Sequence, residues 1–434
     1  MEGPALRDEV IELARELIRL DTSNPPGRET PAAELLAAYL DASGVECELV
    51  GPDPERLNLV ARIEGGEAPS LMLMAHTDVV PAPSADWTVP PFAGEVRDGH
   101  LMGRGAADMK GELAARAVAM AALARGGEPP AGDVVFVAES DEERNTAGVG
   151  MSWLVRERPD LQCDYAINES GGLLLELSDG RRVVTISVGE KQVTSLRLRF
   201  FGSSAHASAP AGVDNVLRHA SRAVERLLDH PAPLRIQPVV ARALAALGEA
   251  GEDEAAVNAA AAQHPLLAGL LHAMTRMTIT PTGLHTHEPA NVIPPYADVV
   301  CDCRPLPGDT EADVREQLGA ALGDDLVYEL ELLEPLEGGT ESPADTALYA
   351  ACERYVAERL PGAELLPIIS TGFTDSHWVR SLGTAAYGFA PVFATDPDLY
   401  TRGMHGPDES LAVDDLVEMV SFNLYAIGSL GPPA

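Results

Sequence analysis

Four strand-like apolar segments in the sequence each lead to a side chain that can bind a metal ion. The segments are Leu71–Ala75, Val134–Ala138, Tyr165–Asn168 and Tyr387–Phe389, followed in turn by His76, by Asp141–Glu142–Glu143, by Glu169 and, after a loop, by His405. In open α/β sheets, ligands bind at the carboxyl ends of the strands. The pattern therefore predicts an α/β fold that gathers these histidine and carboxylate groups at one site.

The order of the predicted elements indicates an insertion within this fold. Helical and strand-like segments alternate from an amphipathic helix at Met1–Leu20 to about Gly180, which predicts a mixed, largely parallel sheet flanked by helices. Arg182–Val188 and Gln192–Phe200 then alternate apolar and polar residues, as in an antiparallel hairpin. A helix-rich stretch follows, in which the acidic, alanine-rich segment Ala241–Ala262 is expected to be a mobile surface excursion. An α+β unit inserted into an α/β domain explains this order.

The overall composition excludes several partners. The 434 residues carry a net charge of -36, which disfavours nucleic acid and anionic membranes, because both need a basic surface. The N-terminal segment lacks the basic start and apolar run of a signal peptide, and no stretch is apolar enough to predict a membrane span. The five scattered cysteines are typical of reduced thiols, and we expect a cytoplasmic protein.

Each candidate ligand, considered alone, could also have an ordinary structural role. His76 alone is more typical of a hydrogen-bonded structural residue, but Asp78 is placed to orient a metal-bound imidazole, or else to form a turn. Asp108 precedes an apolar helix, and its spacing favours an N-terminal cap over a carboxylate that bridges two metals. Glu142 and Glu143 either lie in a solvated loop or act as general base and metal ligand.

Taken together, the acidic groups and the two histidines predict a dinuclear metal centre. Asp108, Glu143, Glu169 and a bridging hydroxide would balance the charge of two divalent cations. Nitrogen and oxygen donors without thiolate suit zinc, with cobalt or manganese as substitutes. Burying so many acids without a cation is unfavourable, which argues against a purely structural protein.

The order and local sequence of these motifs resemble the dinuclear zinc aminoacylase/carboxypeptidase family, which includes acetylornithine deacetylase, succinyl-diaminopimelate desuccinylase, glutamate carboxypeptidase and carboxypeptidase S-like enzymes. The resemblance covers essentially the whole chain. It includes Thr22–Gly27, Trp87–Phe92 and Asn291–Pro294. Two departures are Arg144–Thr146 after the paired glutamates and the acidic segment in the insertion.

The resemblance implies a role for each motif. His76, Asp108 and Glu169 would hold one zinc ion, and Asp108, Glu143 and His405 the other. Glu142 would be the general base, and Asp78 the partner of His76. His206 would polarise the scissile carbonyl, Arg304 would bind a substrate carboxylate, and Asn291 and Thr374 would contact the substrate.

The implied domains are a catalytic domain over residues 1–181 and 297–434 and an inserted lid over residues 182–296, with an alternative end near residue 335. The lid is the expected surface of a homodimer.

The expected activity is zinc-dependent hydrolysis of an amide bond in an N-acyl amino acid or a short peptide with a free carboxylate. Carboxypeptidase or dipeptidase activity and N-deacylation both fit the sequence. A non-catalytic module that binds metal or peptide is a further alternative, disfavoured because every predicted catalytic and metal-binding residue is present.

Overall fold

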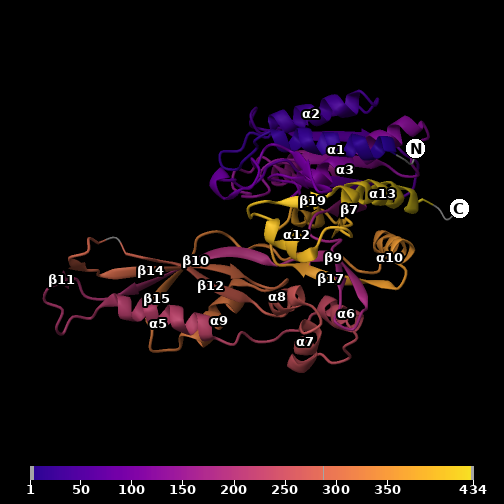
Figure 1. The fold of residues 1–434 in the computed structure, drawn as a ribbon. Helices are drawn as coiled ribbons and strands as arrows, with labels where there is room; N and C mark the ends of the chain where they lie inside the picture. Colours follow the sequence, from indigo (N-terminus) through magenta and orange to yellow (C-terminus); the bar gives the residue numbers. More distant parts are fainter. Residues whose placement is uncertain (1–3, 287, 432–434) are drawn as a thin grey trace. The chain divides into compact units, whose positions relative to one another are not determined.

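A computed structural model describes residues 4–286 and 288–431 of the chain. Residues 1–3 of the predicted N-terminal helix lie outside the described part. The chain forms two compact units (Figure 1). Unit 1 comprises Met1–Val188, Ser342–Ile368 and Thr374–Ala434, and unit 2 comprises Gly189–Glu341 and Ile369–Phe373.

Unit 1 is built on a mixed sheet with the strand order β1-β2-β6-β3-β7-β18-β9-β17, to which β8 is added beside β9. Its strands are β1 (Cys47–Val50), β2 (Asn58–Ile63), β3 (Leu71–His76), β6 (Val134–Glu139), β7 (Tyr165–Asn168), β8 (Leu174–Glu176), β9 (Arg182–Glu190), β17 (Ala363–Ser370) and β18 (Ala385–Gly388). β3 runs parallel to both β6 and β7, and β18 runs parallel to β7. Every residue of β3 and β6 is buried, as expected for parallel strands in the centre of a covered sheet.

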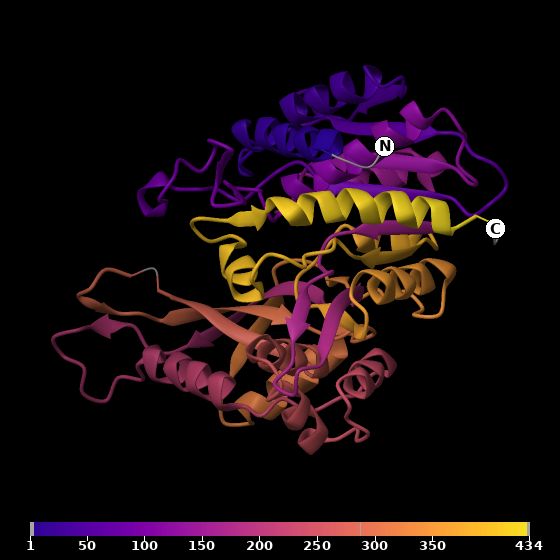
Figure 2. The same cartoon turned by 45° about the vertical axis from the view of Figure 1, so that its right-hand side comes forward.

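Helices cover this sheet. They are α1 (Pro4–Arg19), α2 (Thr30–Asp41), α3 (Lys110–Gly126), α4 (Met151–Glu157), α10 (Ala347–Arg359), α11 (Ser376–Ser381), α12 (Pro397–Gly403) and α13 (Val413–Ser429). α1, α3 and α13 pack on one another, with α13 drawn in yellow along this layer in Figure 2. α4 and α11 supply Leu154 and Val379 to a core that contains Met72 and Met74 of β3. The sequence predicts an apolar face made of Val10, Leu13, Leu17 and Leu20. The first three are buried, whereas Leu20 follows the end of α1 and is half-buried.

A small antiparallel sheet brings two distant loops of unit 1 together. It consists of β4 (Glu95–Arg97), β5 (His100–Met102) and β19 (Ser410–Ala412), with β5 in the middle. Ser410 pairs with Met102, so the loop that follows β5 lies beside the loop that precedes β19. These loops carry Asp108 and His405.

Unit 2 is an α+β unit whose main sheet has the order β12-β14-β10-β15, with β16 beside β10. Its strands are β10 (Gln192–Phe201), β11 (Ala205–His206), β12 (Thr278–His285), β13 (Val292–Ile293), β14 (Tyr296–Arg304), β15 (Tyr328–Leu332) and β16 (Glu337–Gly338), and its helices are α5 (Val216–Asp229), α6 (Pro238–Ala246), α7 (Glu254–Ala261), α8 (Pro265–Thr275) and α9 (Glu311–Leu322). α5 and α9 pack against the sheet around Leu198, Phe200 and Val299. The predicted α/β class with an inserted α+β unit is confirmed.

The predicted hairpin is wrong. β9 belongs to the large sheet of unit 1, where it pairs with β8 and β18, whereas β10 pairs with β14 and β15 in unit 2. β9 is buried at nearly every position, while β10 alternates between buried and half-buried residues. The two segments alternate similarly in sequence, so the pattern alone does not show that the strands belong to different sheets.

The predicted end of the insertion at residue 296 is also wrong. β14 pairs antiparallel with both β10 and β12, so Tyr296–Arg304 belongs to the sheet of unit 2. The compact unit extends to Glu341, close to the alternative end near residue 335, and begins at Gly189 rather than at residue 182.

The acidic, alanine-rich segment, which we expected to be a mobile surface excursion, is helical and packs on α8. It forms the last part of α6, a short connection and α7, and both helices contact α8. Ala243, Leu244, Val257 and Ala260 are buried, because small apolar side chains allow the helices to approach closely. Within residues 4–286 and 288–431, no helix combines the length and the apolar character needed to cross a membrane.

Candidate metal centre

The candidate ligands lie at one edge of the sheet of unit 1. His76 is the last residue of β3, and Glu169 directly follows β7. Glu142 and Glu143 come from the loop after β6. Because β6, β3 and β7 are parallel neighbours, their carboxyl ends meet at the same edge.

Asp108 lies between two histidines. Its Oδ1 is 3.0 Å from His76 Nε2, and its Oδ2 is 3.1 Å from His405 Nε2. Oε2 of Glu169 is 3.9 Å from His76 Nε2, and Oε2 of Glu143 is 3.1 Å from His405 Nε2. Two groups of possible ligand atoms result, His76–Asp108–Glu169 and Asp108–Glu143–His405, each with its atoms within 4.8 Å of one another.

This geometry bears on the alternatives for Asp108. α3 begins at Lys110, Met109 occupies the cap position, and no side chain caps the helix. The Asp108 carboxylate instead turns one oxygen to each histidine. Asp108 therefore does not cap the helix, and its position between the two histidines is compatible with a carboxylate shared by two cations.

The electrostatics of the cluster fit a pair of divalent cations. Burial and then repulsion from Asp108 raise the pKa of Glu169 to about 8 and also raise the pKa of Glu143. Contacts with Asp108 and Glu143 raise the pKa of His405 to about 10. To stay ionised together, the carboxylates therefore need compensating positive charge, from protons on the imidazoles or from bound cations. Five nitrogen and oxygen ligands around two positions suit zinc or a similar ion.

The Asp78 carboxylate has a broader role than orienting His76. The nearest partner of His76 Nδ1 is the backbone oxygen of Asp78 at 2.9 Å, while Oδ1 of Asp78 lies 3.5 Å away. The carboxylate accepts hydrogen bonds from the backbone N–H groups of Glu142 at 3.1 Å and Glu143 at 3.2 Å. Asp78 therefore fixes the loop that carries both glutamates.

Glu142 lies beside the candidate ligands. Burial, followed by the nearby Glu169, raises its pKa well above the usual value for a glutamate. A carboxylate with a raised pKa suits a group that accepts and returns a proton near neutral pH.

Thr374, a predicted substrate-contact residue, also lies in unit 1 and is buried next to Asp375.

Glu409 is a structural residue of the site that the sequence did not indicate. Its buried carboxylate accepts hydrogen bonds from the backbone N–H groups of Gly105, Ala107 and Asp108, at 3.0, 2.8 and 2.9 Å. Arg104 Nη1 binds the same carboxylate at 2.6 Å. Glu409 thus holds the loop that ends in Asp108 next to the segment that carries His405.

Left-handed backbone also shapes the site. Asp141, Ser170 and His405 have φ angles of 67°, 77° and 58°, a region that non-glycine residues seldom occupy. His405 is a candidate ligand, Asp141 precedes the candidate base Glu142, and Ser170 follows the candidate ligand Glu169. Aspartate and histidine adopt this conformation more often than most residues, but the sequence alone does not show at which positions they do so.

The remaining predicted site residues belong to unit 2. His206 lies in β11, and its Nδ1 is 2.7 Å from the hydroxyl of Ser208. Arg304 ends β14 and binds Asp302 at 3.0 Å, and Asn291 is exposed just before β13. None of the three is a member of the cluster in unit 1.

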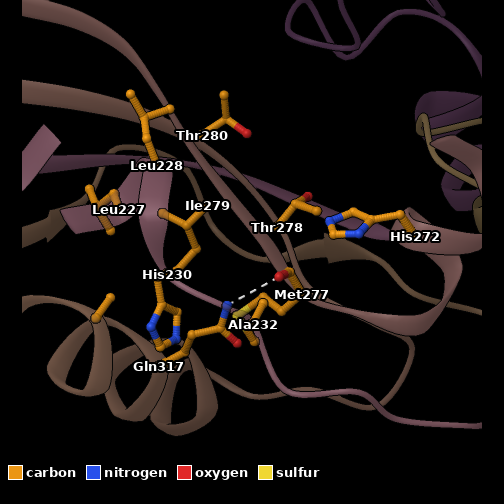
Figure 3. A pocket seen from close by; sticks show the side chains of 11 residues that line it. Leu227, Leu228, His230, Ala232, His272, Met277, Thr278, Ile279, Thr280 and Gln317 are labelled. Atoms are coloured by element: carbon orange, nitrogen blue, oxygen red, sulfur yellow. Dashed lines mark hydrogen bonds between the residues drawn. The ribbon is translucent and has the colours of Figure 1, made fainter. Parts of the chain in front are cut away.

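Unit 2 also contains a hollow of about 220 Å³, shown in Figure 3. Its lining comprises Leu227, Leu228, His230, Ala232, His272, Met277, Thr278, Ile279, Thr280, Gln317 and Ala321. Gln317 Nε2 donates to the backbone oxygen of Met277 at 3.1 Å. This lining has no carboxylate, so it lacks the donor set of the metal cluster.

The fold and the cluster define a class of protein, a two-unit α/β protein with a candidate two-metal centre. Residues 72–428 match the model of Peptidase family M20/M25/M40, and the chain belongs to this family. It is therefore a metallohydrolase of the peptidase or amidohydrolase type, and the predicted family resemblance is confirmed.

Several characterised proteins are similar to the chain. The human N-fatty-acyl-amino acid synthase/hydrolase PM20D1 is 29% identical over 381 residues, which cover 82% of this chain and 74% of PM20D1. Succinyl-diaminopimelate desuccinylase of Rhodospirillum centenum is 34% identical over 232 residues, which cover 51% of this chain and 57% of the desuccinylase. The M20 family metallo-carboxypeptidase Sso-CP2 from Sulfolobus solfataricus superimposes with a TM-score of 0.75 at 20% identity, covering 98% and 99% of the two chains, which is a likeness of fold.

Proposed function

We propose that this chain hydrolyses the amide bond of an N-acyl amino acid or a short peptide that carries a free carboxylate. The observation that carries the proposal is the bridging position of Asp108 between His76 and His405, with Glu142 beside the same cluster. The similarity to PM20D1 and to succinyl-diaminopimelate desuccinylase, both named for acting on N-acyl compounds, favours N-deacylation.

In this proposal His76, Asp108, Glu169, Glu143 and His405 hold two zinc ions. When bound, the cations would polarise the amide carbonyl and lower the pKa of water. Cobalt or manganese would serve as substitutes.

Glu142 accepts a proton from the attacking water as the water oxygen bonds to the carbonyl carbon. The C–N bond then breaks, and Glu142 returns the proton to the leaving nitrogen. Burial is the main cause of the raised pKa of Glu142, and a buried carboxylate beside the ligands suits this exchange of a proton.

We also propose that four further residues interact with the substrate, as the sequence predicts. Arg304 would bind the free carboxylate, His206 would polarise the carbonyl, and Asn291 and Thr374 would contact the substrate. Homodimerisation through the inserted unit and a cytoplasmic location also stay predictions.

The test uses the full chain loaded with zinc or cobalt and a panel of N-acetyl, N-succinyl and long-chain N-acyl amino acids together with dipeptides. Glu142→Gln should keep its metal content but lose about 10²–10⁴-fold in kcat. Glu157→Gln is the matched control, because it makes the same change on the exposed surface of α4. Unchanged activity in Glu142→Gln would remove Glu142 as the base, and hydrolysis of no substrate by the metal-loaded wild type would contradict the proposed function.

A further inference from the structure

The N-terminal segment Thr22–Gly27 runs along the residues that follow β3. Ser23 forms a parallel bridge with Val79, Asn24 N donates to Val79 O at 2.9 Å, and Val79 N donates to Thr22 O at 3.3 Å. The Thr22 hydroxyl donates to Thr77 O at 2.7 Å. The segment is therefore fixed to the strand end that carries His76 and Asp78.

The side chain of Asn24 joins two buried carboxylates from different loops. Its Nδ2 is 2.9 Å from Asp78 Oδ2 and 3.0 Å from Asp141 Oδ1, and Asn24 is only 4% exposed. Ionised carboxylates only accept hydrogen bonds, so both amide hydrogens of Asn24 must point to these oxygens. One neutral group thereby separates two like charges that would otherwise repel each other.

Each of these carboxylates in turn holds part of the candidate active-site loop. Asp78 accepts from the backbone N–H groups of Glu142 and Glu143, as described above. Asp141 Oδ2 accepts from the N–H groups of Ala147 at 2.8 Å and Gly148 at 3.2 Å. Both ends of the stretch from Glu142 to Gly148 therefore depend on carboxylates that Asn24 connects.

Arg56 and Gly27 complete the arrangement. Arg56 Nη2 lies 3.1 Å from Asp141 Oδ1, and its guanidinium also binds the buried Glu29. Gly27 has a φ of 79°, and a Cβ there would lie 2.3 Å from the Arg56 guanidinium carbon. The glycine at the end of the segment thus leaves room for the guanidinium that pairs with Asp141.

We propose that Asn24 is a positioning residue, which holds the His76 loop and the Glu142–Glu143 loop in register by bridging Asp78 and Asp141. This inference rests on the proposed function for its effect on catalysis, but its effect on metal binding does not depend on the substrate. The side-chain amide of Asn24 donates to Asp78 and Asp141, so Asn24 acts through these two carboxylates.

The decisive variant is Asn24→Asp, which keeps the size of the side chain but replaces the donor with an acceptor. In the full chain loaded with Co²⁺, kcat should fall 10–100-fold with KM within about twofold, and metal affinity should fall by a similar factor. The Co²⁺ absorption spectrum should change as the ligand loops shift. The introduced carboxyl can donate only when protonated, so the ratio of variant to wild-type kcat should rise as the pH falls.

Ser23→Ala is the matched control in the same segment, since the Ser23 hydroxyl donates to Asp21, whose side chain is exposed. Asp141→Asn tests the bridge from the other side if Asn24→Asp fails to fold, and should lower metal affinity in the same direction. An Asn24→Asp protein with wild-type kcat, metal affinity and Co²⁺ spectrum would overturn the proposal. If the wild type hydrolysed none of the substrates, the proposed function would fail while the affinity and spectral measurements still decided the role of Asn24.

Discussion

Lys191 shows how a single buried charge makes stability depend on pH. The chain has only two lysines, and Lys191 is fully buried in unit 2. Its Nζ donates to the backbone oxygen of Arg276 at 2.8 Å and to the hydroxyl of Thr278 at 3.3 Å. Burial lowers the pKa of Lys191 from 10.5 to about 8, because the two neutral acceptors do not replace the water lost by the ammonium group.

The direction of the pH effect follows from proton binding. Between about pH 8 and 10.5 the unfolded chain keeps a proton on Lys191 that the folded chain has lost. The contribution of Lys191 to the free energy of unfolding therefore rises with pH across this window. The full shift corresponds to about 3 kcal/mol.

We expect this rise to disappear in Lys191→Met. Urea unfolding of the wild type and the variant from pH 7 to 10.5 should give a stability difference, wild type minus variant, that grows with pH. Arg315→Met is a suitable control, because Arg315 lies in an exposed pair with Glu311, so the same change is made without removing a buried charge. A difference for Lys191→Met that stayed constant with pH would contradict the expected lowered pKa.

The sequence indicates the candidate ligands, but it does not indicate that Asn24 and Glu409 position the loops that carry them. His76, Glu143 and Glu169 are visible because each follows an apolar strand, and the topology of an α/β sheet brings strand ends together. Asn24 and Glu409 act through contacts between loops that are distant in sequence. The bond between Glu409 and the N–H of Asp108, for example, spans 301 positions.

At the level of secondary structure, local periodicity succeeds where an element has one buried face. In α9 (Glu311–Leu322), for example, Val314, Leu318 and Leu322 recur at helical spacing and form the buried face. Periodicity fails for β9 and β10, since pairing partners far along the chain decide which sheet each strand joins. It also fails for α6 and α7, because alanine marks a helix but does not show which side packs.

The packing of α7 gives a direct test at this scale. Ala260 is fully buried, while its neighbour Ala259 is exposed. Ala260→Gln forces a longer polar side chain between the helices and should cost about 1–3 kcal/mol. Ala259→Gln makes the same change on the solvent side and should stay within about 0.5 kcal/mol of the wild type. Equal thermal stability of the two variants would favour a loosely attached segment instead of a packed helix.

For the whole molecule, negative charge is the dominant electrostatic property. The net charge of -36 destabilises the folded chain through self-repulsion, which salt screens. The cluster around Asp108 concentrates part of this charge in a buried place that salt screens poorly. Divalent cations in the cluster should therefore contribute to global stability as well as to catalysis.

Removing the cations should lower the melting temperature. At a free cation concentration of about 100 times Kd, binding to the folded state alone adds about 2.7 kcal/mol, and chelation removes it. The prediction is checked by calorimetry of the zinc-loaded and EDTA-treated chain, with re-addition of Zn²⁺ restoring the original transition. Asp108→Asn should show a much smaller shift, since it loses the carboxylate that faces both histidines. Asp98→Asn, on an exposed turn where asparagine also accepts the positive φ of 50°, should behave like the wild type. An equal shift in Asp108→Asn and the wild type would mean that the cations act by screening the acidic surface and not by occupying the cluster.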